Sequence, residues 1–172
     1  MAHIQLSTLN RIKDEVGEWT NYNFDTTSKT DPLLGVVEET GELSHAVLKS
    51  NQGIRGTQEE HKEAIRDAIG DIMVYLLDFM NRNDIDVHQS EMFHVGKYNL
   101  DRLMLKLSLN VGLLSGTFLS YDFDNLDFDC DIIIKTLEAI CETFDWSLEE
   151  VLIETWSEVS QRDWVENPET GG

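Results

Sequence analysis

The stretch from Thr57 to Asp84, TQEEHKEAIRDAIGDIMVYLLDFMNRND, predicts a long amphipathic helix around which the chain can fold. Thr57 followed three residues later by Glu60 is the pattern of a capping box, so the helix should start there. Apolar residues then recur at steps of three and four, as one buried helix face requires. They are Ile65, Ile69, Ile72, Leu76, Phe79 and Met80. We expect the helix to end around Arg82 to Asp84.

Two helices should precede this one. Apolar residues at helical spacing predict a first helix from Leu6 to about Asn21. After a polar stretch, Asp31 is the expected N-cap and Pro32 the first-turn proline of a second helix, which begins near Leu33. The cluster from Ser50 to Gly53 should end it. A short linker makes the second and third helices antiparallel neighbours.

The second half of the chain is less regular at first, over residues 86–96. A helix should run from Leu100 to a soft end near Gly116, and the acidic, aromatic stretch 122–131 should form a loop. Residues 132–144 form the next predicted helix, and a second capping box at Ser147 opens the last one. No alternating strand pattern appears. The fold class is therefore all-α, an antiparallel helix bundle in a single domain, 1–172, in which residues 87–172 extend a core of residues 1–86.

Composition limits the class of protein. The chain has 172 residues, of which 41% are hydrophobic, which is enough for one domain with its own core. It has no apolar run long enough for a membrane span and no signal-like N-terminus, so we expect a cytoplasmic protein without a membrane partner. Cys130 and Cys141 fit no disulfide or zinc pattern and are expected to be buried free thiols.

A formal net charge of −20 disfavours direct binding to nucleic acid, because both surfaces repel each other. An anionic substrate would need a metal ion to mediate its binding. Acids at helical spacing supply such a site: Glu38, Glu39 and Glu42 lie on one face of the second helix, and Asp67 and Asp71 on one face of the third. Facing carboxylates form the oxygen-rich cage that Mg²⁺ prefers.

These residues resemble a known family. The segments GVVEETGEL, from Gly35 to Leu43, and DAIGDIMVY, from Asp67 to Tyr75, are similar to the MazG-like all-α nucleoside triphosphate pyrophosphohydrolases. The family pattern is E-E-x-x-E, a spacer and E-x-x-D. The first part matches completely and the last aspartate matches Asp71. Ala68 stands where the second part of the pattern has its glutamate, so Asp67, one position earlier, is the expected substitute.

The resemblance implies a hydrolase that converts an NTP or dNTP to its monophosphate and pyrophosphate, with a nucleotide-pool housecleaning role. It implies Mg²⁺, or Mn²⁺ in its place, as the cofactor. Glu39, Glu42 and Asp71 are the expected metal ligands, with Asp67 as an auxiliary ligand. Glu38 is the candidate for orienting or deprotonating the attacking water.

Four further residues are candidates for binding the substrate, and each has a plainer alternative. Trp19 and Tyr75 can face the nucleotide base, or they can be ordinary core aromatics. Lys49 and Arg55 can bind phosphates, or they can be exposed solubilising charges. Members of the resembled family form dimers or tetramers, which implies a homo-oligomer here.

Two other functions also fit the sequence. The spacing E-x-x-H occurs at Glu42 and His45 and again at Glu91 and His94, as in the helical bundles that hold two iron ions. The high negative charge also fits an acidic binding protein that mimics nucleic acid and has no catalytic activity.

Overall fold

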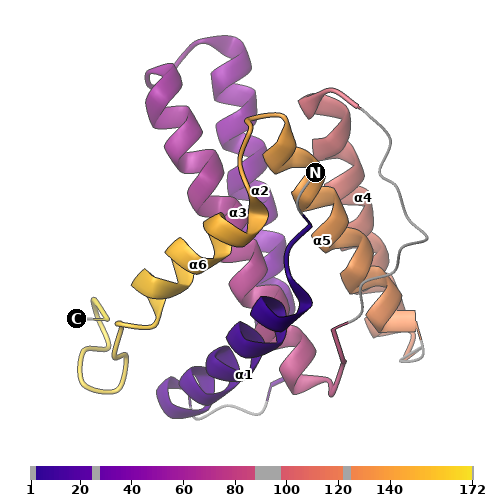
Figure 1. Cartoon of the computed structure of the whole chain (residues 1–172), viewed down its shortest axis with the longest axis vertical. Helices are drawn as coiled ribbons and strands as arrows, with labels where there is room; N and C mark the ends of the chain where they lie inside the picture. Colours follow the sequence, from indigo (N-terminus) through magenta and orange to yellow (C-terminus); the bar gives the residue numbers. More distant parts are fainter. Residues whose placement is uncertain (1–2, 25–27, 88–97, 122–124, 172) are drawn as a thin grey trace.

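A computed structural model of the chain describes residues 3–24, 28–87, 98–121 and 125–171. These residues form six α-helices and contain no β-strand, which confirms the predicted all-α class (Figure 1). The helices are α1 (Leu6–Asn23), α2 (Asp31–Gln52), α3 (Gln58–Arg82), α4 (Leu100–Leu119), α5 (Leu126–Glu142) and α6 (Leu148–Val159).

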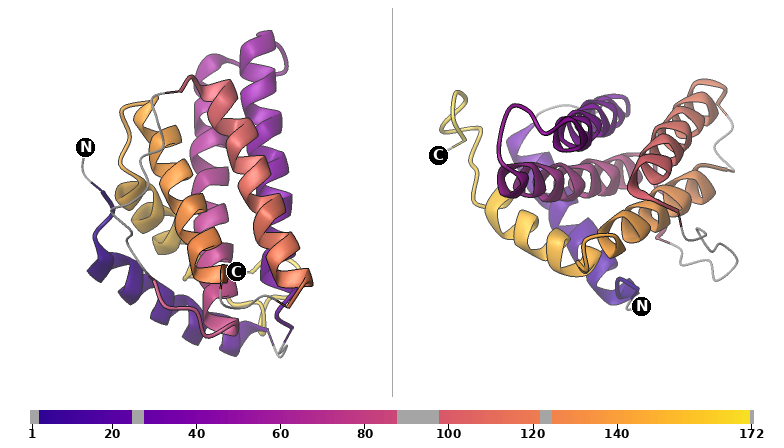
Figure 2. Two further views of the ribbon diagram at one scale, coloured as in Figure 1. Left: turned by 90° about the vertical axis from the view of Figure 1, so that its right-hand side faces the viewer. Right: turned by 90° about the horizontal axis from the view of Figure 1, so that it is seen from above.

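Helix α3 is the centre of the molecule. It packs against α1, α2, α5 and α6, and its apolar residues are almost all buried. The predicted capping box is present: Glu60 N donates to Thr57 Oγ1, and Thr57 N donates to Glu60 Oε2. Figure 2 shows α1 crossing the lower end of the α2–α3 hairpin, with the α4–α5 hairpin beside it. One continuous buried apolar cluster joins all six helices.

The crossing of α6 over α3 depends on Gly70. A Cβ atom at this position would overlap the Thr155 side chain of α6, so only glycine allows the two helices to come this close. The hydrogen side chain of Gly70 therefore serves the contact between these two helices. A neighbouring residue of α3, Ala68, is buried in the core.

Two local predictions are wrong. Asp31 is the first residue of α2 and not its N-cap, which is Thr30, because Ser28 Oγ accepts the backbone N–H groups of both residues. The stretch 122–131 was predicted as a loop, yet α5 begins at Leu126; residues 122–124 lie outside the described part. Acids in the first turn of α5, Asp127 and Asp129, favour a helix N-terminus electrostatically.

The α4–α5 hairpin otherwise follows the prediction. Helix α4 continues three residues beyond Gly116, and α5 carries both cysteines as free, buried thiols. Burial raises the pKa of Cys141 to about 12, so this thiol stays protonated and unreactive at neutral pH. No helix in the described residues is long and apolar enough to cross a membrane.

Candidate functional site

The five predicted carboxylates lie on two paired helices. Glu38, Glu39 and Glu42 belong to α2, and Asp67 and Asp71 to α3, which run side by side over most of their length. Within the described residues, none of the five makes a hydrogen bond or ion pair. A group of carboxylates that forms no ion pair or hydrogen bond is costly in a folded chain, most of all where it is partly buried.

Electrostatics show that these carboxylates influence one another. Burial raises the pKa of Glu39 to about 7, and the negative charge of Asp71 contributes next, followed by the other three acids. Burial also raises the pKa of Asp71 to about 6, with Asp67 as the second cause, while nearby Arg162 lowers it. The acids of α2 and α3 therefore share one electrostatic field, as their spacing predicts.

The described side chains do not form a finished metal cage. No three His, Cys, Asp or Glu side chains of the described residues lie close enough together to hold a metal ion. The donor set nevertheless fits Mg²⁺ in chemistry, because it consists of carboxylate oxygens with unbalanced negative charge. Glu38 and Glu42 are exposed and can change rotamer without unpacking the core.

The carboxylates open onto two neighbouring hollows. Glu39 and Asp71 line the first, which we call the aromatic pocket; Glu42 and Asp67 line the second, which we call the hairpin hollow. Glu38 borders both. The acidic cluster therefore stands between two spaces of different chemistry.

The aromatic pocket has a volume of about 570 Å³, and four rings line it: Trp19, Phe24, Tyr75 and Trp164. Trp19 is also a structural residue. Its ring packs edge-on against Phe24 and Trp156, with centroids 5.6 and 6.0 Å away, and its Nε1 donates to the Arg162 carbonyl. The two alternatives for Trp19 are therefore not exclusive, since the ring packs against its neighbours while the side chain also borders a cavity.

Tyr75 lies against α2 at Gly35. A Cβ atom on Gly35 would overlap the Tyr75 ring, so the glycine lets the ring lie flat on the helix. The side chain remains 37% exposed and lines the pocket. Burial, and then the charges of Glu39 and Glu38, raise its pKa, which keeps the hydroxyl protonated as a hydrogen-bond donor.

The C-terminal segment supplies two pocket residues that sequence reasoning assigned no role. Arg162 and Trp164 follow α6 and line the aromatic pocket. The segment is fixed to α1, because Trp164 N donates to Asn23 Oδ1 at 2.7 Å and Trp19 holds the Arg162 carbonyl at 3.0 Å. The only sequence signal was an arginine and a tryptophan placed directly after a helix, which is too general to locate them.

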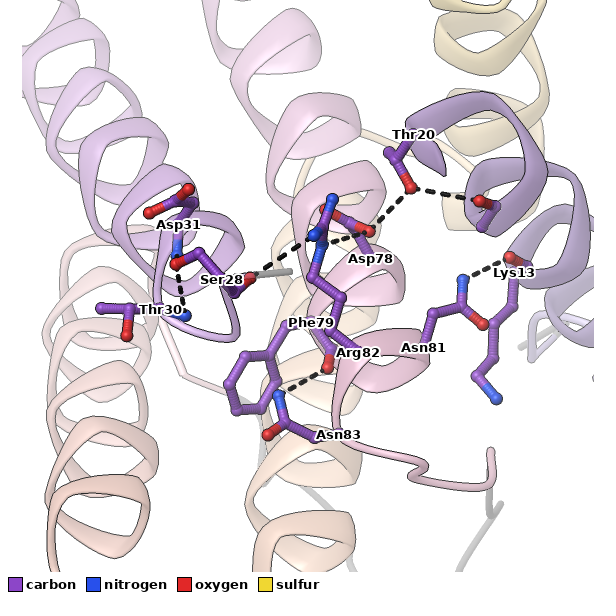
Figure 3. A network of polar contacts seen from close by, with 11 residues as sticks. Lys13, Thr20, Ser28, Thr30, Asp31, Asp78, Phe79, Asn81, Arg82 and Asn83 are labelled. Carbon is purple, nitrogen blue, oxygen red and sulfur yellow. Dashed lines mark hydrogen bonds and ion pairs between the residues drawn. The ribbon is translucent and has the colours of Figure 1, made fainter. Parts of the chain in front are cut away.

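A buried polar network, drawn in Figure 3, contributes Thr20, Asp78 and Arg82 to the lining of this pocket. Arg82 Nε donates to both carboxylate oxygens of Asp78 at 3.0 Å, and Thr20 Oγ1 donates to Asp78 Oδ1 at 3.0 Å. Arg82 also donates to the Ser28 carbonyl. Burial still raises the pKa of Asp78, with Arg82 opposing it. The network joins α1, α3 and the start of α2, and so fixes the position of Trp19 relative to Asp71.

The hairpin hollow has a volume of about 780 Å³ and lies at the end of α2 and the start of α3. Lys49 and Arg55, the two predicted phosphate-binding residues, both line it, together with His45 and His61. The second E-x-x-H pair, Glu91 and His94, lies outside the described residues. Only half of the iron-bundle pattern can therefore be located, at Glu42 and His45.

Comparisons with protein-family models, with curated proteins and with solved structures found no match to this chain.

Proposed function

We propose that this chain is a Mg²⁺-dependent nucleoside triphosphate pyrophosphohydrolase, similar in kind to the MazG-like enzymes. One observation carries the proposal. Glu39 and Asp71 come from different helices, have raised pKa values, form no ion pair within the described residues and line a pocket of aromatic rings. Perturbed carboxylates in a hollow beside stacking surfaces suit a nucleotide held through a metal ion.

The charge of the chain supports the metal. A triphosphate would meet five carboxylates on a chain of net charge −20 and would be repelled. A divalent cation at Glu39, Glu42 and Asp71, with Asp67 beside them, removes that repulsion and supplies charge neutralisation and an acidified water when bound. Mn²⁺ has the same preference for oxygen ligands and would substitute.

The position of each residue then gives its proposed role. The rings of Trp19 and Tyr75 hold the base in the aromatic pocket, and Phe24 and Trp164 enclose it. Glu38 borders both hollows, where it can accept the proton of a water molecule. That water attacks the α-phosphorus, the bond from this phosphorus to the bridging oxygen of the β-phosphate breaks, and pyrophosphate leaves with that electron pair.

The experiment that tests this activity separates the two possible phosphate products. The full chain is incubated with Mg²⁺ and each of the common NTPs and dNTPs, and pyrophosphate and orthophosphate are measured independently. We expect monophosphate and pyrophosphate in equal amounts from at least one nucleotide, and none with EDTA. Absence of pyrophosphate from every nucleotide would refute the proposed function.

We also propose that copies of the chain associate through α4. Its outer face exposes Leu105 (72%), Leu109 (60%) and Leu113 (52%), and the chain has no charged residue from Leu107 to Tyr121. Two chains of net charge −20 can associate through this face without bringing like charges together. Solution mass tests this: Leu109→Glu should reduce the mass of the native species, whereas a wild-type monomer would refute it.

A further inference from the structure

The hairpin hollow combines features that the carboxylates alone do not explain. Its lining extends from Glu42 and Asp67 to Arg55 and Gly56. The last two belong to the loop that closes the α2–α3 hairpin, which Figure 1 shows at the upper end of these helices. At a rise of about 1.5 Å per residue, Lys49 lies about 10 Å along α2 from Glu42. The hollow therefore continues the carboxylate seam away from the aromatic pocket.

His61 is the first unexplained group. Its side chain is buried, with the residue only 5% exposed, yet its Nε2 atom has no hydrogen-bond partner in the described chain. The loop closes over the ring at Gly56, where an added Cβ would come within 3.2 Å of His61 Cε1. A buried ring nitrogen without a partner is unfavourable, and native structures rarely keep one without a use.

Arg55 is the second unexplained group in the hairpin hollow. It adopts a left-handed conformation with φ of 62°, which is unfavourable for a residue other than glycine. It forms no ion pair or hydrogen bond in the described residues, although the chain has 33 acids. By contrast, Arg11, Arg66 and Arg82 each pair with a carboxylate. The strained loop thus holds an unpaired guanidinium at the rim of the hollow.

We propose that the hairpin hollow binds the diphosphate portion of the substrate, and then the released pyrophosphate, with His61 Nε2 and the Arg55 guanidinium as donors and Lys49 beside them. This inference rests on the proposed function. The nucleotide would lie along the α2–α3 seam, with its base in the aromatic pocket, its α-phosphate at Glu38 and its last two phosphates over the hairpin end. His61 was not a candidate from sequence, because a lone histidine on a helix has no distinctive pattern.

The hollow should bind pyrophosphate only together with a divalent cation. Glu38, Glu42, Glu60 and Asp67 also line it, and their charges repel an anion unless a cation neutralises them. Arg55 and His61 then supply the hydrogen bonds that distinguish a diphosphate from any smaller anion. The nucleoside monophosphate product, in contrast, should depend on the aromatic pocket.

The test uses the full chain and two probes, inorganic pyrophosphate and the nucleoside monophosphate product, each titrated calorimetrically in the presence of Mg²⁺. Arg55→Ala and His61→Ala should each weaken pyrophosphate binding by about ten- to a hundredfold, the usual cost of losing a hydrogen bond to a charged group. Neither should change monophosphate affinity. Tyr75→Ala should weaken monophosphate binding and leave pyrophosphate affinity unchanged.

Lys62→Ala is the matched control, because it removes one positive charge from the same end of α3 without lining the hollow. Thermal melting confirms that each variant folds; if His61→Ala does not, Arg55→Ala carries the test. Unchanged pyrophosphate affinity in the folded variants, or an equal loss in Lys62→Ala, would overturn the inference even if the enzyme releases pyrophosphate. Binding that depends on Arg55 in a chain without turnover would instead refute the activity and retain the site.

Discussion

The two helical hairpins use the same residue types for different purposes. On α5, Asp129 accepts a hydrogen bond from Thr117 at 2.6 Å, and Glu138 accepts one from the backbone N–H of Ile4 at 2.9 Å. On the α2–α3 hairpin, Glu39 and Asp71 are half-buried but make no such hydrogen bond within the described residues. Carboxylates satisfied by the fold are structural, whereas those left unsatisfied are available for a ligand.

Two glycines of each hairpin also differ. Gly35 and Gly70 are pressed against Tyr75 and Thr155, while Gly112 and Gly116 of α4 have nothing within 4 Å of an added Cβ. The first pair allows close contacts that shape the pocket and the core. The second pair lies on the uncharged outer face of α4, where no contact within the chain requires it.

Removing the unsatisfied carboxylates should have the largest effect. Glu39→Gln and Asp71→Asn should each lower kcat/KM for the preferred nucleotide by about 10²–10³-fold, the usual loss when charge stabilisation of a transition state is removed. Pyrophosphate release measures this. Glu142→Gln, at an exposed acid on α5, is the control and should keep full turnover. Equal turnover in all three would mean that the acidic hairpin is not catalytic.

Adding a methyl group where α3 crosses α6 should have the second-largest effect. Gly70→Ala should lower the free energy of unfolding by about 1–3 kcal/mol, because its methyl group overlaps Thr155 in a packed interior. Gly112→Ala should be neutral or stabilising by up to about 1 kcal/mol, since alanine favours a helix and has open space there. Urea denaturation compares the two. Equal effects would show that this tight crossing can relax.

A subtler change at the pocket should act on substrate binding. Gly35→Ala should displace the Tyr75 ring, which is partly exposed and can rotate away, and raise KM about three- to tenfold through loss of a stacking contact. Steady-state kinetics measure the change. Gly116→Ala serves as the control for adding a methyl group to a helix. A decrease in kcat with constant KM would contradict a role for Tyr75 in holding the base.

The smallest expected effect is a dependence of stability on pH. Folding raises the pKa of Glu39 from 4.5 to about 7 and that of Asp71 from 3.8 to about 6, so the folded chain binds these protons more tightly than the unfolded chain. Without metal, stability should fall as pH rises through this range and then level off. Mg²⁺ displaces the protons, so its stabilising effect should grow over the same range.

Thermal melting at about pH 5 and about pH 8, with and without Mg²⁺, measures this linkage. The double variant Glu39→Gln, Asp71→Asn should lose both the pH dependence assigned to these groups and the response to Mg²⁺. Stabilisation by Mg²⁺ that is larger at the lower pH would contradict the assignment.

Most of the helices could be predicted because their signals are local. Periodic apolar residues and the cap at Thr57 defined α3, and the same reasoning placed α1, α2, α4 and α6. The start of α5 was missed, because an acidic, aromatic run resembles a loop until its acids are placed in a first turn. Asp31 was misplaced by one position, since Ser28 supplies the bonds that a capping aspartate would have made.

The sequence by itself determined the all-α class and the alignment of carboxylates on two helix faces, because both follow from the helical repeat. Tertiary structure alone decided that Arg162 and Trp164 meet Trp19 at one pocket, that Gly70 admits α6, and that His61 is buried beneath Gly56. Such contacts depend on how helices cross, and the packing of distant side chains fixes a crossing that no local pattern records.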